Sequence, residues 1–127
     1  MAPVTEGKRT AEFLVSEANG HRSREEVTVT VAANTTVPAG RIMGRITATG
    51  KYVPQVAAGT DNGTREPAAI LYANVTNDTG DAADFTATIV ARDAEVEGAA
   101  LTYDPAANAG AIATANADLA AFGLIVR

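Results

Sequence analysis

Residues 25–32 read EEVTVTVA, and this stretch indicates the fold class of the chain. Three valines, Val27, Val29 and Val31, alternate with threonines, and a period of two is typical of a strand with one buried face. The preceding SREE, residues 23–26, resembles a helix capping box, but the strict alternation that follows outweighs a helix start. We therefore predict a half-buried strand here.

Short β-prone segments follow this strand and are separated by turn signals. The turn signals are Pro38, Gly40 and Gly44 within TVPAGRIMGRITATGKY (36–52), and the tight-turn dipeptide Asn62-Gly63. We expect them to shape the fold, because no Gly-Lys-Ser/Thr follows Gly44 and a phosphate loop is therefore absent. The regular spacing of short β-prone segments between turn signals predicts a mainly β domain. The segments are RIMGRI (41–46), KYV (51–53), AILYANV (69–75), FTATIVARDAEV (85–96) and ALTY (100–103).

The two ends of the chain differ from this middle part. Residues 1–24 are a polar leader, predicted to be a flexible N-terminal arm with a β-prone island at 12–16, and residues 25–127 a single β-rich domain. An unpacked arm predicts that deleting residues 1–23 leaves the melting temperature nearly unchanged. Near the C-terminus, Thr114 or Asn116 is expected to cap one short helix that ends at Gly123, before GLIVR closes the chain as a strand.

The composition limits both the core and the partners. The 127 residues suit one domain, but aromatics are only 5% and much of the apolar content is alanine, so the core is thin and oligomerisation would supplement it. The net charge of −5 disfavours nucleic-acid binding, and proteins are the expected partners. The N-terminus lacks the apolar stretch of a signal peptide and no run of about 18 apolar residues occurs, which disfavours export and membrane insertion.

Groups that carry chemistry are scarce. With no cysteine and one histidine, His21 in the leader, catalytic triads and most zinc sites are disfavoured, and His21 is expected to be an exposed bystander. The remaining candidates are two acidic clusters. The first, at residues 78–84, lacks the spacing of an EF-hand loop and is predicted to be a solvated turn. The second, at residues 93–97, alternates along a strand and is predicted to be a solvated strand face. The sequence alone leaves open a bound cation or a glycosidase-like carboxylate pair, and singles out neither. We predict no enzyme activity, no cofactor and no metal. The acidic clusters are Asp78, Asp81 and Asp84, and Asp93, Glu95 and Glu97.

Taken in order, four segments resemble the head decoration proteins of lambda-type tailed bacteriophages. The leader EFLVSEANGHRSREEVTV resembles the family's arm and first strand, and VPAGRIMGRI resembles its "aGtvLG" signature. DNGTREPAAILYANV resembles its Asp-Gly turn and "gIL" strand, with Ala69 where the family often has glycine. ADLAAFGLIVR resembles its closing helix and "GI.vR". The resemblance covers residues 13–127, and the order of the motifs carries it.

This resemblance implies a β-clip type domain and a homotrimer on the outer surface of the phage capsid. Such trimers sit at local threefold positions after the shell expands and clamp neighbouring major capsid subunits against the pressure of packaged DNA. The protein would be made in the host bacterial cytoplasm and end in the virion. The family's flexible arm pairs with capsid strands, and here that role falls on Glu12, Phe13, Leu14, Val15 and Ser16.

A second class of function stays open at this point. A β-rich binding module for carbohydrate, or for another virion component, would need aromatic platforms. The only tyrosines are Tyr52, Tyr72 and Tyr103, and each is expected to be half-buried in a strand.

Overall fold

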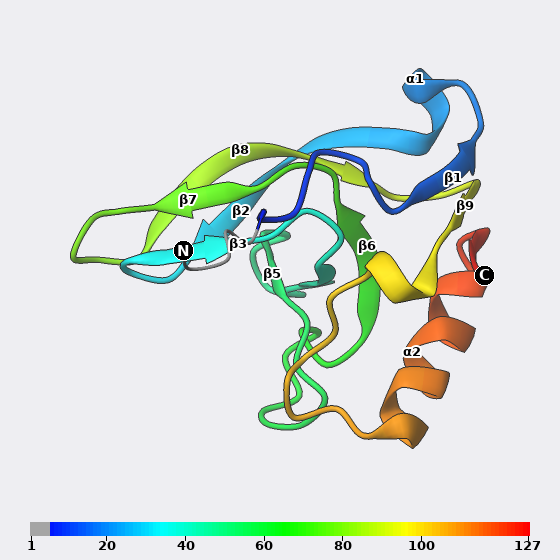
Figure 1. The fold of residues 1–127 in the computed structure, drawn as a ribbon. Helices are drawn as coiled ribbons and strands as arrows, with labels where there is room; N and C mark the ends of the chain where they lie inside the picture. The colour runs from blue at the N-terminus through cyan, green and yellow to red at the C-terminus, as the bar shows by residue number, and fades with distance from the viewer. Residues whose placement is uncertain (1–5) are drawn as a thin grey trace, which may run out of the picture.

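The computed structural model describes residues 6–127, which fold as a mainly β unit with one longer helix near the C-terminus (Figure 1). The predicted fold class is confirmed in this respect; the β-clip type stays a prediction of the resemblance. Two helices are α1 (Gly20–Ser23) and α2 (Ala109–Ala120), and η1 (Gly98–Ala100) is a 3-10 turn. The strands are β1 (Leu14–Glu17), β2 (Arg24–Val31), β3 (Thr35–Val37), β4 (Ile42–Arg45), β5 (Tyr52–Pro54), β6 (Pro67–Leu71), β7 (Val75–Asn77), β8 (Ala83–Val90), β9 (Ala94–Val96) and β10 (Leu124–Val126).

Five strands close into a barrel in the order β2-β5-β4-β6-β8. Its longest pair is antiparallel, with β2 and β8 in register from Arg24 opposite Val90 to Val31 opposite Ala83. Two smaller sheets extend this barrel at opposite ends of the long pair, as Figure 1 shows. One is the two-stranded β3-β7 sheet, and the other has the order β1-β9-β10.

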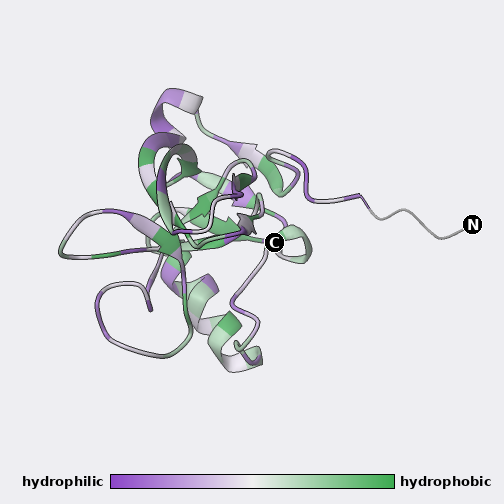
Figure 2. Cartoon of the chain, turned by 90° about the vertical axis from the view of Figure 1, so that its left-hand side faces the viewer, coloured by the Kyte–Doolittle hydropathy of each residue, from purple (hydrophilic) through white to green (hydrophobic). Residues whose placement is uncertain are grey.

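The molecule has two hydrophobic cores on either side of the barrel wall. Neighbouring residues of one wall strand, such as Ile42 and Met43 or Ile70 and Leu71, belong to different cores because successive side chains point to opposite faces. The barrel core contains Val29, Val31, Val37, Met43, Ala69, Leu71, Ile89 and Ala91. The second core contains Phe13, Ile42, Ile70, Val90, Ala94, Val96, Leu101, Leu119 and Leu124. Figure 2 shows the hydrophobic segments gathered at the centre of the molecule.

The alternating segment forms β2 as predicted, with Val29 and Val31 fully buried and Val27 half-buried. The predicted cap of the C-terminal helix is wrong. Asn108 caps α2, because its Oδ1 accepts a hydrogen bond from the Ala111 backbone N–H at 2.8 Å. The predicted end is correct: Gly123 adopts a φ of 78°, and its N–H donates to the Ala120 carbonyl.

The described part of the leader is packed against the rest of the chain, which corrects the prediction of an unpacked arm. Phe13 is 0% exposed and belongs to the second core. Hydrogen bonds to their backbone hold the residues before it, since Ala11 N–H donates to the Tyr72 carbonyl at 2.9 Å and the Asn74 side-chain Nδ2 donates to the Lys8 carbonyl at 2.9 Å. Residues 1–5 of the predicted arm lie outside the described residues.

Candidate interaction site

The β-prone island of the leader lies partly in an edge strand. Leu14, Val15 and Ser16 belong to β1, whereas Glu12 and Phe13 precede the strand in a turn. β1 pairs antiparallel with β9, and Glu97 N–H donates to the Phe13 carbonyl at 2.8 Å. Among the described residues, no strand pairs with the other side of β1. Val15, at a bulge in this strand, is 58% exposed. An unpaired strand edge offers backbone donors and acceptors to an incoming extended chain, so β1 is a candidate for strand addition.

The predicted arm residues divide into anchoring and exposed positions. Phe13 is buried in the second core, and Leu14 packs partly against it. Glu12 pairs with Lys8 at 3.5 Å, and Ser16 Oγ donates to Glu95 at 3.0 Å. Of the five predicted residues, Phe13 therefore points into the core, whereas Val15 is exposed.

A cluster around Glu17 holds β1 against β2. The Glu17 carboxylate accepts hydrogen bonds from Ser23 Oγ at 2.7 Å and from Arg24 Nε at 3.2 Å. The Arg24 guanidinium also lies 4.3 Å from the centroid of the Tyr72 ring, a cation–π distance. Burial raises the pKa of Glu17, but the hydrogen bonds from Arg24 and Ser23 outweigh it and leave that pKa below its ordinary value. The carboxylate thus stays charged and links the edge strand to the barrel.

The acidic residues around β9 lie as the sequence predicted, with Glu95 outward and both Ala94 and Val96 buried. Arg127 Nη2 donates to Glu95 at 2.7 Å, and Arg22 Nε donates to Asp93 at 2.9 Å. The pKa of Glu95 lies below its ordinary value, and the hydrogen bond from Arg127 contributes most to lowering it. These carboxylates are therefore neutralised by arginines of the same chain.

In the other acidic cluster, only the Asp84 carboxylate forms side-chain hydrogen bonds and an ion pair among the described residues. Asp84 accepts from Lys51 Nζ and from Thr30 Oγ1, each at 2.6 Å, and these bonds lower its pKa. Asp78 and Asp81 are exposed in the β7–β8 loop. Within residues 6–127, no three His, Cys, Asp or Glu side chains are grouped as metal ligands. His21 is exposed in α1, as predicted.

The predicted turn residues lie in two turns, and Gly44 contacts the second of them. Arg41 N–H donates to the Pro38 carbonyl at 3.1 Å, and Gly40 has a φ of 86°, so Pro38 to Arg41 form a turn. Gly44 packs against the second turn, because a Cβ at this position would lie 2.6 Å from the Thr64 carbonyl oxygen. Asn62 Oδ1 accepts from Thr64 N–H at 3.2 Å, which closes that turn. The two glycine-containing segments thus form one packing contact on the barrel wall.

The three tyrosines do not stand out as a sugar platform. All are half-buried, as predicted, although only Tyr52 lies within a strand. The ring of Tyr72 is covered by Arg24, and the Tyr103 hydroxyl donates a hydrogen bond to Asn116 Oδ1. The carbohydrate alternative therefore gains no support from these side chains.

An unpaired strand edge is typical of surfaces that bind an extended segment. No helix among the described residues is long and apolar enough to cross a membrane. The model of the family "Bacteriophage lambda head decoration protein D" matches residues 3–124, nearly the whole chain. The chain therefore belongs to this family of structural proteins of the phage capsid. No individual curated protein matches it.

Proposed function

We propose that this chain forms a homotrimer that binds the exterior of the expanded phage capsid at local threefold sites and stabilises the shell against DNA pressure. The match of the decoration family over residues 3–124 carries this proposal. Its partners are further copies of itself and the major capsid protein, and its work needs no catalysis, cofactor, nucleic acid or membrane. It is made in the host bacterial cytoplasm and acts in the virion.

The residues proposed for attachment are Glu12 to Ser16, acting by strand addition. Because Phe13 is buried and one side of β1 already pairs with β9, attachment would use the other side of β1 while the strand stays docked. Backbone hydrogen bonds from an extended capsid segment would then continue the β1-β9-β10 sheet. The exposed side chain of Val15 lies where such a segment would pass.

Stabilisation follows from binding to one state of the shell. A protein that binds only the expanded lattice stabilises that lattice by about 2.7 kcal/mol per site when its free concentration is a hundredfold above Kd. Many occupied sites add up to resistance against rupture, and no covalent bond is made or broken.

The proposal is tested with purified capsids in their expanded and unexpanded forms. We expect saturable binding to expanded shells only, and a trimer mass by light scattering. Replacing the exposed valine, Val15→Asp, should weaken capsid binding at least about tenfold, since a desolvated carboxylate would oppose the incoming strand. The matched control Ile125→Asp changes an exposed residue on β10, the opposite edge of the same sheet, and should bind like the unchanged protein. Equal binding to both shells would contradict the proposal.

A further inference from the structure

We propose that a groove beside the C-terminal end of α2 is the contact through which copies of this chain assemble. The groove has a volume of about 490 Å³ and lies between the end of α2, the start of β6 and the end of β4. We call it the Phe122 groove; its walls include Phe122, Ala121, Pro67 and Ala68, and its charged rim includes Glu66, Asp118 and Arg45. This inference rests on the homotrimer of the proposed function and adds the surface that forms it.

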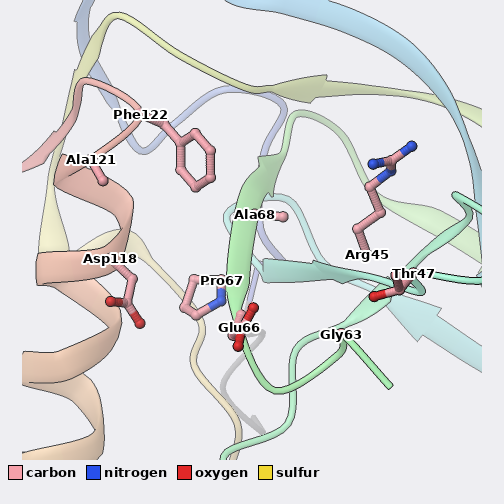
Figure 3. Close-up of a pocket in the computed structure, with 9 residues that line it drawn as sticks. All are labelled: Arg45, Thr47, Gly63, Glu66, Pro67, Ala68, Asp118, Ala121 and Phe122. Atoms are coloured by element: carbon pink, nitrogen blue, oxygen red, sulfur yellow. The ribbon is translucent and has the colours of Figure 1, made fainter. Parts of the chain in front are cut away.

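The first observation is an exposed aromatic ring. Phe122 is 48% exposed, whereas Phe13 is fully buried and Phe85 half-buried. Figure 3 shows the Phe122 ring projecting from the end of α2 toward β6, with Ala121 beside it and Pro67 and Ala68 across the groove. Covering a half-exposed apolar ring with a second surface lowers the free energy, and aromatic residues of this kind are typical anchors at the centre of interfaces.

The second observation is the distribution of charge. The chain has ten lysines and arginines. Seven of them pair with carboxylates of the same chain, and Arg41 is buried and donates to the carbonyls of Ile42 and Gln55. Within residues 6–127, Arg45 and Arg65 are left without an ion pair. Arg45 lines the Phe122 groove, and Arg65 lines an adjoining cavity of about 230 Å³ that shares Pro67 and Asp118 with it.

Two carboxylates on this rim are also without an ion pair among the described residues, Glu66 and Asp118. The same face therefore carries unpaired charges of both signs around an apolar centre. A partner of one charge sign would meet repulsion at half of these positions. A second copy of this chain supplies both signs, so that an arginine of one copy can lie against a carboxylate of the next.

The assembly contact must extend beyond the Phe122 groove. A stable interface buries about 800 Å² on each partner, more than the groove alone offers. The solvent face of α2 continues the surface, and Asp118 is the only charged residue on that helix. Its small side chains permit close approach of a neighbouring backbone.

The test is the mass of the full chain in solution as a function of concentration, measured by light scattering. We expect Phe122→Ser to weaken self-association about tenfold to a hundredfold, because a buried ring is lost from the contact. The control Ile125→Ser changes another exposed apolar residue, on β10, that does not line the Phe122 groove, and it should leave self-association unchanged. Circular dichroism of the Phe122→Ser protein should show a folded chain, since the ring contributes little to either core.

A second variant tests the charges. Asp118→Arg should also weaken self-association, and adding Arg65→Asp to the same chain should restore part of it. A Phe122→Ser protein that assembles like the unchanged chain would overturn the inference while leaving capsid decoration intact. An unchanged chain that is a monomer at every concentration would overturn both the inference and the proposed trimer, and the capsid-binding experiment would still test attachment separately.

Discussion

The two cores of this molecule are built from different parts of the chain. The barrel core takes all its buried residues from positions 29–91, and most of them lie in strands of the barrel. The second core joins the wall of the barrel to the leader, through Phe13, and to the C-terminal segment, through Leu119 and Leu124. Only the second core therefore depends on both ends of the chain being in place.

This difference teaches how a chain poor in aromatic residues makes a stable unit. The barrel core has no buried aromatic residue and relies on aliphatic side chains from strand pairs. The second core gains one large ring, Phe13, which the leader supplies across a long stretch of sequence. The leader is thus both a structural clamp and, in our proposal, the attachment strand.

The largest effect is expected from removing that ring. Phe13→Ala should lower the free energy of unfolding by about 3–5 kcal/mol, because it leaves a cavity in a closed core. Met43→Ala in the barrel core should cost about 2–5 kcal/mol, so the leader should matter as much as the barrel. Urea unfolding at fixed protein concentration measures both. A loss below about 1 kcal/mol for Phe13→Ala would show that the second core does not need the leader.

A close packing contact of the barrel wall is tested at Gly44. Gly44→Ala would place a Cβ 2.6 Å from the Thr64 carbonyl oxygen, and we expect a loss of about 1–3 kcal/mol from overpacking. Gly80→Ala is the matched control, because a Cβ there has no neighbour within 4 Å. Thermal melting followed by circular dichroism compares the two. Similar melting temperatures for both variants would contradict the packing argument.

A smaller effect is expected at Glu17, whose contact with Arg24 joins β1 of the leader to β2 of the barrel. Glu17→Gln should cost about 1 kcal/mol, because it removes charge-assisted hydrogen bonds to Arg24. The pKa of Glu17 is lower in the folded protein than in the unfolded one, so its contribution is complete above about pH 4.3 and is lost as the pH falls through the folded-state pKa. Unfolding curves measured from neutral pH downward should therefore converge for the two proteins in acid. A constant difference across this range would contradict the assignment.

The smallest effect is expected from an exposed ion pair on the barrel. Lys51 and Asp84 are about two-fifths exposed, and Lys51→Ala should change stability by at most about 0.5 kcal/mol. Salt near 1 M should remove this difference, because it shortens the screening length to about 3 Å. A larger, salt-independent loss would indicate that Lys51 has a packing role.

Much of the fold could be predicted because it is local. The alternation in β2, the turn at Pro38 to Gly40 and the helix end at Gly123 each depend on the backbone preferences of adjacent residues. The start of α2 could not be predicted, since asparagines and threonines that suit a cap occur at several positions and alanines give no helical period. Asn108 caps the helix because its side chain reaches the Ala111 N–H in the folded chain.

The candidate site was predicted in part. The β-prone residues at 12–16 predict a strand, which the structure forms over Leu14–Glu17, and the order of the motifs predicts the family whose model matches residues 3–124. The Phe122 groove and the adjoining cavity could not be predicted, because their two arginines and two carboxylates are scattered over residues 45–118 and look like ordinary surface charges until the ion pairs are known.

By itself, the sequence determined the mainly β class, the positions of the turns and membership of the decoration family, because these depend on residue order and on backbone geometry over a few neighbours. The tertiary structure decided that Phe13 is a core residue, that Gly44 faces Thr64 and that Phe122 is exposed. The physical reason is that burial depends on which distant segments close over a side chain, and a single apolar residue in a polar stretch carries no periodic signal of that closure.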